Sequence, residues 1–111
     1  MSPRDAMTPP AHLKPATKTW WRSVVADYEL EEHHLRLLTA AAEAWDRLTQ
    51  AREALRRHGM VYADRFGSPK ARPEVAIERD SRIAFARLLR ELALNVEAPN
   101  SSQPPRIRGR A

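Results

Sequence analysis

The chain has 111 residues, of which 42% are hydrophobic, 6% aromatic and 30% charged; its formal net charge is +5 and it has no cysteine. This length predicts one small domain with a modest core, and the lack of cysteine excludes disulfides and thiolate metal sites. No apolar run approaches the roughly 20 residues that span a bilayer, and the first residues do not resemble a signal peptide. We therefore expect a protein without membrane contact that stays in the cytoplasm where it is made.

The positive charge is concentrated outside the segments with helical patterning. Residues 31–58 and 74–94 each contain equal numbers of arginines and acidic residues, so each sums to zero. Residues 1–18, 59–73 and 95–111 each carry a surplus of +2. The uncompensated positive charge therefore lies in the parts of the chain that are not predicted to be helical.

The N-terminal part predicts a disordered arm followed by a helix. Residues 1–12 contain three prolines and no apolar periodicity, as is typical of disordered chain. Proline is favoured at a first helical position, and apolar side chains then recur every three or four residues. We predict a helix over roughly Pro15 to Asp27. Trp20 and Trp21 fit its core side better than a stacking surface for nucleic acid.

A second, longer helix is predicted from Glu31 and Glu32 to His58. Acidic residues at its start and basic residues at its end complement the helix dipole, and Gly59 is suited to end it. The apolar residues along this segment form a stripe too wide for one narrow seam. We therefore expect more than one neighbouring element to cover it.

The remaining segments predict a short β-hairpin or extended loop, a third helix and a basic tail. Met60 to Tyr62 can form a strand, the chain can turn near Gly67, and it can return toward Arg72. A helix over roughly Pro73 to Leu94 should then pair antiparallel with the second helix. Residues 97–111 are rich in Pro, Ser and Arg and predict a disordered tail.

Together these elements predict an all-α fold with disordered termini. The first two helices form a helix-turn-helix-like N-terminal pair. The second and third helices form a long antiparallel helical hairpin, and the short β-hairpin or loop lies between them. We expect a disordered arm over 1–12, a helical DNA-binding and oligomerisation domain over 13–96, and the basic tail over 97–111. The surplus apolar helix surface favours self-association.

The sequence offers no catalytic constellation that we recognise. Gly67 to Lys70 lacks the second glycine and the Lys-Ser/Thr pair of a phosphate-binding loop, so it predicts a turn. His33 and His34 are adjacent, which on a helix points their side chains about 100° apart and disfavours joint metal binding. We therefore expect no enzyme activity, no metal site and no cofactor.

Basic residues spaced by four predict a DNA-binding face on the first helix, with an ordinary solvated face as the equal alternative. The arginines of the tail can bind phosphate even from a disordered segment. The candidate DNA contacts are Lys14, Lys18, Arg22, Arg36, Arg106, Arg108 and Arg110. The candidate core or oligomer-interface residues are Trp45, Leu48, Leu55, Ile83 and Leu88.

The order of features along residues 13–96 is informative as a set. A leucine precedes a Trp-containing helix, and the block LLTAAAEAWDRLTQAREALRRHG ends at Gly59. Met60-Val61-Tyr62 and Pro73-Glu74 follow, before a final helix that closes with RELALNV. In this order the chain resembles the small terminase subunits of tailed phages, specifically the P27 group. Members of that group often have Gly-Leu where this chain has Ala93-Leu94, a departure confined to a helix end.

This resemblance implies a homo-oligomeric ring that recognises the packaging site on the viral genome in the cytoplasm of the infected bacterial host. The implied partners are double-stranded viral DNA, the large terminase subunit and further copies of the chain. ATPase and nuclease activities would belong to the large subunit, which the small subunit recruits and modulates. Two alternatives stay open: a dimeric helix-turn-helix transcription regulator, and a structural helical oligomer without DNA affinity.

Overall fold

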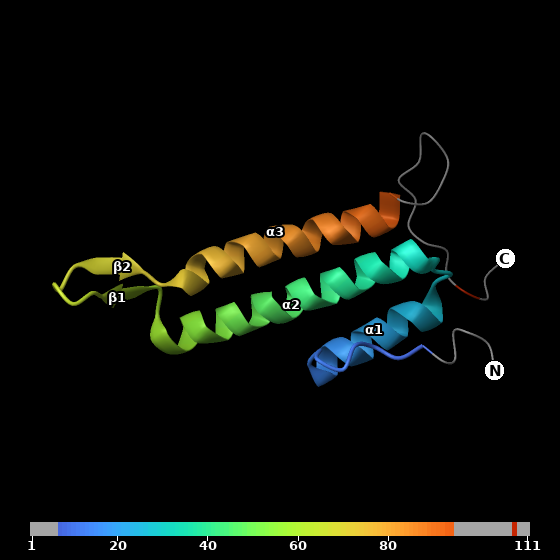
Figure 1. The fold of residues 1–111 in the computed structure, drawn as a ribbon, viewed down its shortest axis with the longest axis horizontal. Helices are drawn as coiled ribbons and strands as arrows, with labels where there is room; N and C mark the ends of the chain where they lie inside the picture. Colours follow the sequence, from blue (N-terminus) through green and yellow to red (C-terminus); the bar gives the residue numbers. More distant parts are fainter. Residues whose placement is uncertain (1–6, 95–107, 109–111) are drawn as a thin grey trace.

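The computed structural model describes residues 7–94 and Arg108. Its elements are α1 (Pro15–Asp27), α2 (Glu32–His58), β1 (Val61–Ala63), β2 (Pro69–Ala71) and α3 (Pro73–Leu94). Helices α2 and α3 lie antiparallel side by side, α1 lies on the opposite side of α2, and the β-hairpin extends beyond the far end of the helical pair (Figure 1). The predicted all-α fold is confirmed, including the short hairpin between the two long helices.

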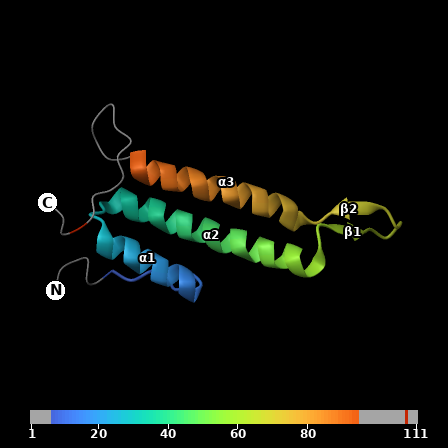
Figure 2. The same cartoon turned by 180° about the vertical axis from the view of Figure 1, so that it is seen from behind.

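The central helix α2 is covered from two sides, as its wide apolar stripe predicts. Small residues dominate its buried surface, with Ala41, Ala42 and Ala44 fully buried, and this allows both neighbouring helices to approach closely. Figures 1 and 2 show the three helices arranged as a single layer. The extents are 63 × 35 × 18 Å and the radius of gyration is 17.9 Å, whereas a compact domain of this length has about 13 Å. The flat shape leaves much helix surface uncovered.

Local signals set the helix ends. Pro15 occupies the start of α1. Helix α2 begins with a reciprocal cap, because the Glu31 side chain accepts the backbone N–H of His34, and the Glu31 backbone N–H donates to His34 Nδ1 at 3.0 Å. At the other end Gly59 has a φ of 80°, a backbone conformation that other residues adopt at a cost. These caps explain why the predicted boundaries match the structure closely.

The main core lies between α1 and the N-terminal half of α2. It is built around Trp21, Val25 and Leu38, together with Leu13 and Ala42. Trp20 packs against this cluster from a partly buried position, so both tryptophans face the protein interior. None of the helices within the described residues has the length and apolarity to cross a membrane.

The segment before α1 differs from the expected arm. Met7 packs against the core cluster and Pro9 is buried, so the packed part of the chain begins within residues 1–12. Residues 1–6 lie outside the described part of the chain. The same holds for the predicted basic tail, with the exception of Arg108.

Candidate nucleic-acid interface

A buried carboxylate anchors the start of α1 to α2. Asp46, only 9% exposed, accepts the backbone N–H of Lys14 through Oδ2 at 2.9 Å and the hydroxyl of Thr17 through Oδ1 at 2.5 Å. A carboxylate is favourable at the positive end of a helix, and both of its oxygens are hydrogen-bonded here. This polar clamp fixes three of the candidate DNA contacts: Lys14 at the N-cap of α1, and Lys18 and Arg22 within the helix.

Those three candidates occupy different environments. Lys14 lies in a shallow groove beside Glu43 and Arg47, where Glu43 already pairs with His12 at 2.8 Å. Lys18 is half-buried and Arg22 is exposed. Within residues 7–94 none of the three forms an ion pair with a carboxylate. Lys18 and Arg22 can therefore meet an external phosphate, and their contact with DNA stays a prediction.

Arg36 is an exposed candidate with a weak internal partner. Its Nη2 donates to Glu32 Oε1 at 2.8 Å, and both side chains are 79% exposed. Exposed pairs with this spacing on a helix contribute only about 0.3 to 0.5 kcal/mol. A phosphate could therefore displace Glu32 at small cost.

Arg108 contacts the C-terminal end of α1. Its backbone N–H donates to the carbonyl of Asp27, and its Nε donates to the carbonyl of Val25 at 2.9 Å. The last turn of α1 has no basic residue of its own, so this guanidinium supplies a cation where the helix dipole favours one. The neighbouring candidates Arg106 and Arg110 lie outside the described residues.

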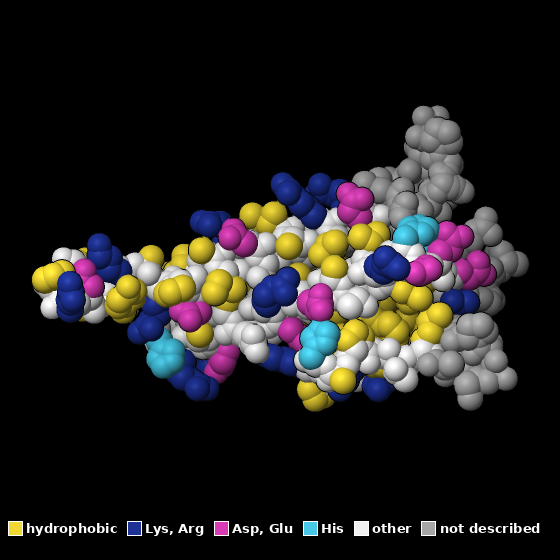
Figure 3. Space-filling model, viewed as in Figure 1, with side chains coloured by type: hydrophobic (Ala, Val, Ile, Leu, Met, Phe, Trp, Pro, Cys, Tyr) yellow, Lys and Arg dark blue, Asp and Glu magenta, His cyan; other side chains and the backbone are white. Residues whose placement is uncertain are grey.

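The β-hairpin carries exposed cations that the sequence-based candidates did not include. Arg65 and Lys70 are exposed, whereas the hairpin's acidic residue, Asp64, is used internally. Its Oδ1 accepts the backbone N–H groups of Phe66 at 2.8 Å and Ser68 at 2.9 Å. The surplus of +2 over residues 59–73 was the sequence signal for these cations. Figure 3 shows basic and hydrophobic side chains together at this end of the molecule.

Other basic side chains are neutralised by partners on the helices. Arg56 and Arg57 both pair with Glu53, at 2.6 and 3.2 Å, and Arg79 pairs with Asp80 at 3.1 Å. The hydrogen bond from Arg56 lowers the pKa of the Glu53 carboxyl and raises the pKa of Arg56 itself. On the face shown in Figure 3 the cations are spread along the helices among acidic groups instead of forming one dense patch. The described residues on this face therefore present only a modest basic surface.

The candidate core and interface residues divide by exposure. Leu48 is 2% exposed, and Leu55 and Leu88 are half-buried. Trp45 and Ile83, in contrast, are 37% and 41% exposed in the single chain. A role for the exposed pair in subunit contacts stays a prediction.

The two adjacent histidines converge, contrary to the expected divergence. Their ring centroids are 4.2 Å apart, because His34 turns back to cap the start of its helix. With Glu31, potential ligand atoms of His33 and His34 lie within 4.8 Å of one another. However, His34 Nδ1 already accepts a backbone N–H and its Nε2 is buried, so neither ring nitrogen is open to an ion in this conformation. The arrangement fits a structural role for His34.

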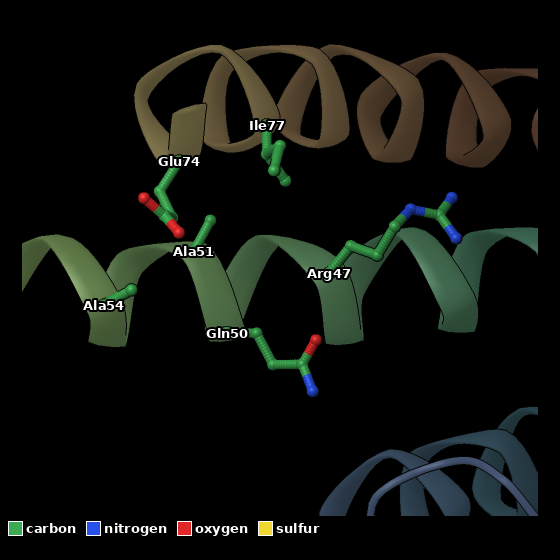
Figure 4. A pocket seen from close by; sticks show the side chains of 6 residues that line it. All are labelled: Arg47, Gln50, Ala51, Ala54, Glu74 and Ile77. Carbon is green, nitrogen blue, oxygen red and sulfur yellow. The ribbon is translucent and has the colours of Figure 1, made fainter. Parts of the chain in front are cut away.

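The recess between α2 and the start of α3 has no catalytic arrangement either. It has a volume of about 310 Å³ and is lined by Arg47, Gln50, Ala51, Ala54, Glu74 and Ile77. In Figure 4, Ile77 and Glu74 point from α3 toward α2, while Gln50 points away from α3. One carboxylate with an arginine, an amide and three aliphatic side chains provides neither a paired acid and base nor an activated nucleophile. This recess is a gap in helix packing.

Comparison with known proteins gives a family-level match. A family model described as phage terminase, small subunit, matches residues 17–105, which include α2, α3, the hairpin and all but the first two residues of α1. The match agrees with the predicted family and does not distinguish the P27 group within it. No curated protein matches the chain, and no solved structure does.

Proposed function

The chain belongs to the phage terminase small-subunit family, and from this premise we propose that it binds double-stranded viral DNA as a homo-oligomeric ring and brings that DNA to the large terminase subunit. The family match supports a role in phage DNA packaging. Under this proposal the chain has no ATPase or nuclease activity of its own, and the large subunit supplies both.

The distribution of charge supports DNA binding. The net charge is +5, and Lys18, Arg22, Arg65 and Lys70 form no ion pairs within residues 7–94. Although these cations are few in one chain, ring symmetry would repeat them on every copy and so form a basic belt. Such a belt binds phosphates by releasing counterions, without requiring a dense patch on any one subunit.

Uncovered apolar side chains support self-association. Large hydrophobic residues are exposed on α2, on α3 and on the hairpin, and a single flat layer of helices cannot cover them. The exposed members are Trp45, Met60, Val61, Tyr62, Phe66, Ile77, Ile83 and Leu89. Assembly would bury these side chains and supply the stabilisation that a modest single-chain core lacks.

Duplex affinity across a salt series tests the DNA contacts. We expect the double variant Lys18→Ala/Arg22→Ala to bind the duplex more weakly than the parent. The slope of its log affinity against log salt should be smaller in magnitude by about 1.8, because each phosphate that is no longer neutralised accounts for about 0.9. The matched control is Arg56→Ala/Arg79→Ala, which removes the same amount of charge from residues that already have carboxylate partners. Its slope should equal that of the parent.

The same series separates the alternatives. An equal loss of affinity in both double variants would show that net charge alone acts and would reject α1 as the contact surface. A parent chain without duplex affinity at low salt would contradict the proposed function and favour a structural oligomer. A parent that binds DNA as a dimer would favour a transcription regulator.

A further inference from the structure

The hairpin presents apolar side chains that the rest of the chain does not cover. Phe66 at its turn is 78% exposed, Met60 is 64% exposed and Val61 is 56% exposed, and every residue of both strands is exposed. An isolated two-stranded hairpin is marginally stable in water, and large exposed apolar groups mark contact sites. The hairpin therefore has the properties of an element that is completed by a partner.

An aromatic recess lies where the three helices meet. It is lined by Ala16, Thr17, Trp20, Trp45 and Phe85. The Phe85 ring centroid lies 6.1 Å from that of Trp20 and 5.0 Å from that of Trp45, and the hydroxyl of Thr17 is already used by Asp46. The volume of about 290 Å³ lies at the lower limit of ligand pockets, which is roughly 300 Å³. Its size and mostly apolar lining suit one large apolar side chain.

The hairpin cannot fill the recess of its own chain. Trp45 lies 13 residues before the end of α2, which corresponds to about 20 Å of helix, and the hairpin points further away along the same axis (Figure 1). The protruding side chain and the recess that fits it are thus held apart on one rigid chain. Only another molecule can bring them together.

We propose that Phe66 of one copy inserts into the aromatic recess of the next copy, and that this head-to-tail contact builds the ring. The inference rests on the proposed function, since it names the surfaces through which the ring forms. A contact between two different surfaces of the same chain produces closed rings when the rotation between neighbours closes. Within the recess, Phe66 gains the tilted aromatic contacts that stabilise such pairs.

The composition of the hairpin favours a protein partner over DNA. Four large apolar residues are exposed on it, whereas Arg72 is half-buried, with its guanidinium 5.9 Å from the Tyr62 ring centroid. Arg65 and Lys70 would then lie at the rim of the contact. Every subunit junction would consequently carry two cations beside the buried Phe66. The contact that builds the ring would thus also contribute cations to the basic belt.

Two variants break opposite sides of the contact. Phe66→Ala removes the inserted ring, and Ala16→Trp fills the recess from an exposed position on α1. Each should raise the protein concentration needed for assembly by roughly a hundredfold, the effect of removing one buried aromatic side chain. The matched controls are Phe66→Leu, which retains a large apolar group, and Ala26→Trp, an exposed position on α1 outside the recess. Ala26→Trp should assemble like the parent, and Phe66→Leu, which loses only the aromatic contacts, should assemble far better than Phe66→Ala.

Mixing the two variants tests the head-to-tail geometry directly. Ala16→Trp retains its Phe66, and Phe66→Ala retains its recess, so an equimolar mixture has one intact contact per pair. Native mass spectrometry should show monomers for each variant alone and a mixed dimer, without larger species, for the mixture. Circular dichroism of each variant checks that the helices remain folded.

The outcomes separate the inference from the proposed function. If the parent forms a ring and both variants assemble equally well, the Phe66 contact is wrong while the ring stands. If Phe66→Ala keeps its mass but loses duplex affinity, the hairpin is a DNA contact and the inference is overturned. A monomeric parent contradicts the proposed ring itself.

Discussion

The two ends of this molecule differ in how much of their apolar surface is buried within one chain. At the end built from α1 and the first half of α2, Leu38 and Ala42 are fully buried and Asp46 holds α1 through two hydrogen bonds. At the hairpin end, Phe66 is 78% exposed and both strands face solvent. The first end is stabilised by contacts within one chain. At the second end the apolar side chains are exposed to solvent, which is typical of an element that contacts a partner.

The largest expected effect comes from truncating the core. Leu38→Ala should lower the free energy of unfolding by about 2 to 5 kcal/mol, because the side chain is fully buried. The matched hairpin variant, Val61→Ala, should change it by less than about 0.5 kcal/mol in dilute monomer. Urea unfolding of both variants measures the difference. Equal destabilisation would mean that the hairpin is packed in the free chain, and the contrast between the two ends would fail.

A smaller effect is expected from the clamp at the start of α1. Asp46→Ala leaves the buried Thr17 hydroxyl without its acceptor, at a cost of about 1 to 3 kcal/mol, whereas the part-buried backbone N–H of Lys14 can turn to water. Asp46→Asn keeps one carbonyl acceptor and should be destabilised less. Thermal melts rank the variants, and hydrogen exchange at Lys14 should accelerate in both. A variant Asp46→Ala that is as stable as the parent would show that the clamp contributes nothing.

The smallest effect concerns the tail and its contact with α1. Replacing Arg106, Arg108 and Arg110 by Ala should flatten the salt dependence of duplex binding by about 0.9 for each phosphate that the tail no longer neutralises, and leave the oligomer mass unchanged. Arg108→Ala alone should also cost about 0.3 to 1 kcal/mol of stability, because its guanidinium hydrogen-bonds a carbonyl at the end of α1. An unchanged slope in the triple variant would reject phosphate contact and favour docking of the tail on the large subunit.

Local signals made the helices predictable, whereas contacts between distant residues did not follow from the sequence. Pro15, Gly59 and Pro73 mark helix ends through their own backbone preferences, so the boundaries could be predicted one segment at a time. The clamp joins Asp46 to Thr17 across 29 residues, and no local pattern indicates such a pair. The packing of Met7 depends on the assembled core in the same way.

The candidate site was only partly predictable for a similar reason. The spacing of Lys18 and Arg22 places them on one helix, but their lack of carboxylate partners within residues 7–94 depends on the tertiary arrangement. The charge surplus indicated the hairpin as a basic segment, while the use of Asp64 in its own turn leaves Arg65 exposed beside it. The aromatic recess needs Trp20, Trp45 and Phe85 from three helices, and such a junction becomes visible only in three dimensions.

Native mass spectrometry of the full chain, alone and with a short duplex, tests the central claim most directly. We predict one closed oligomer larger than a dimer in the absence of DNA, and the same oligomer with added duplex mass when DNA is present. A monomer or dimer at micromolar concentration, or an oligomer that never gains duplex mass, would contradict the proposal that this chain is a DNA-binding ring.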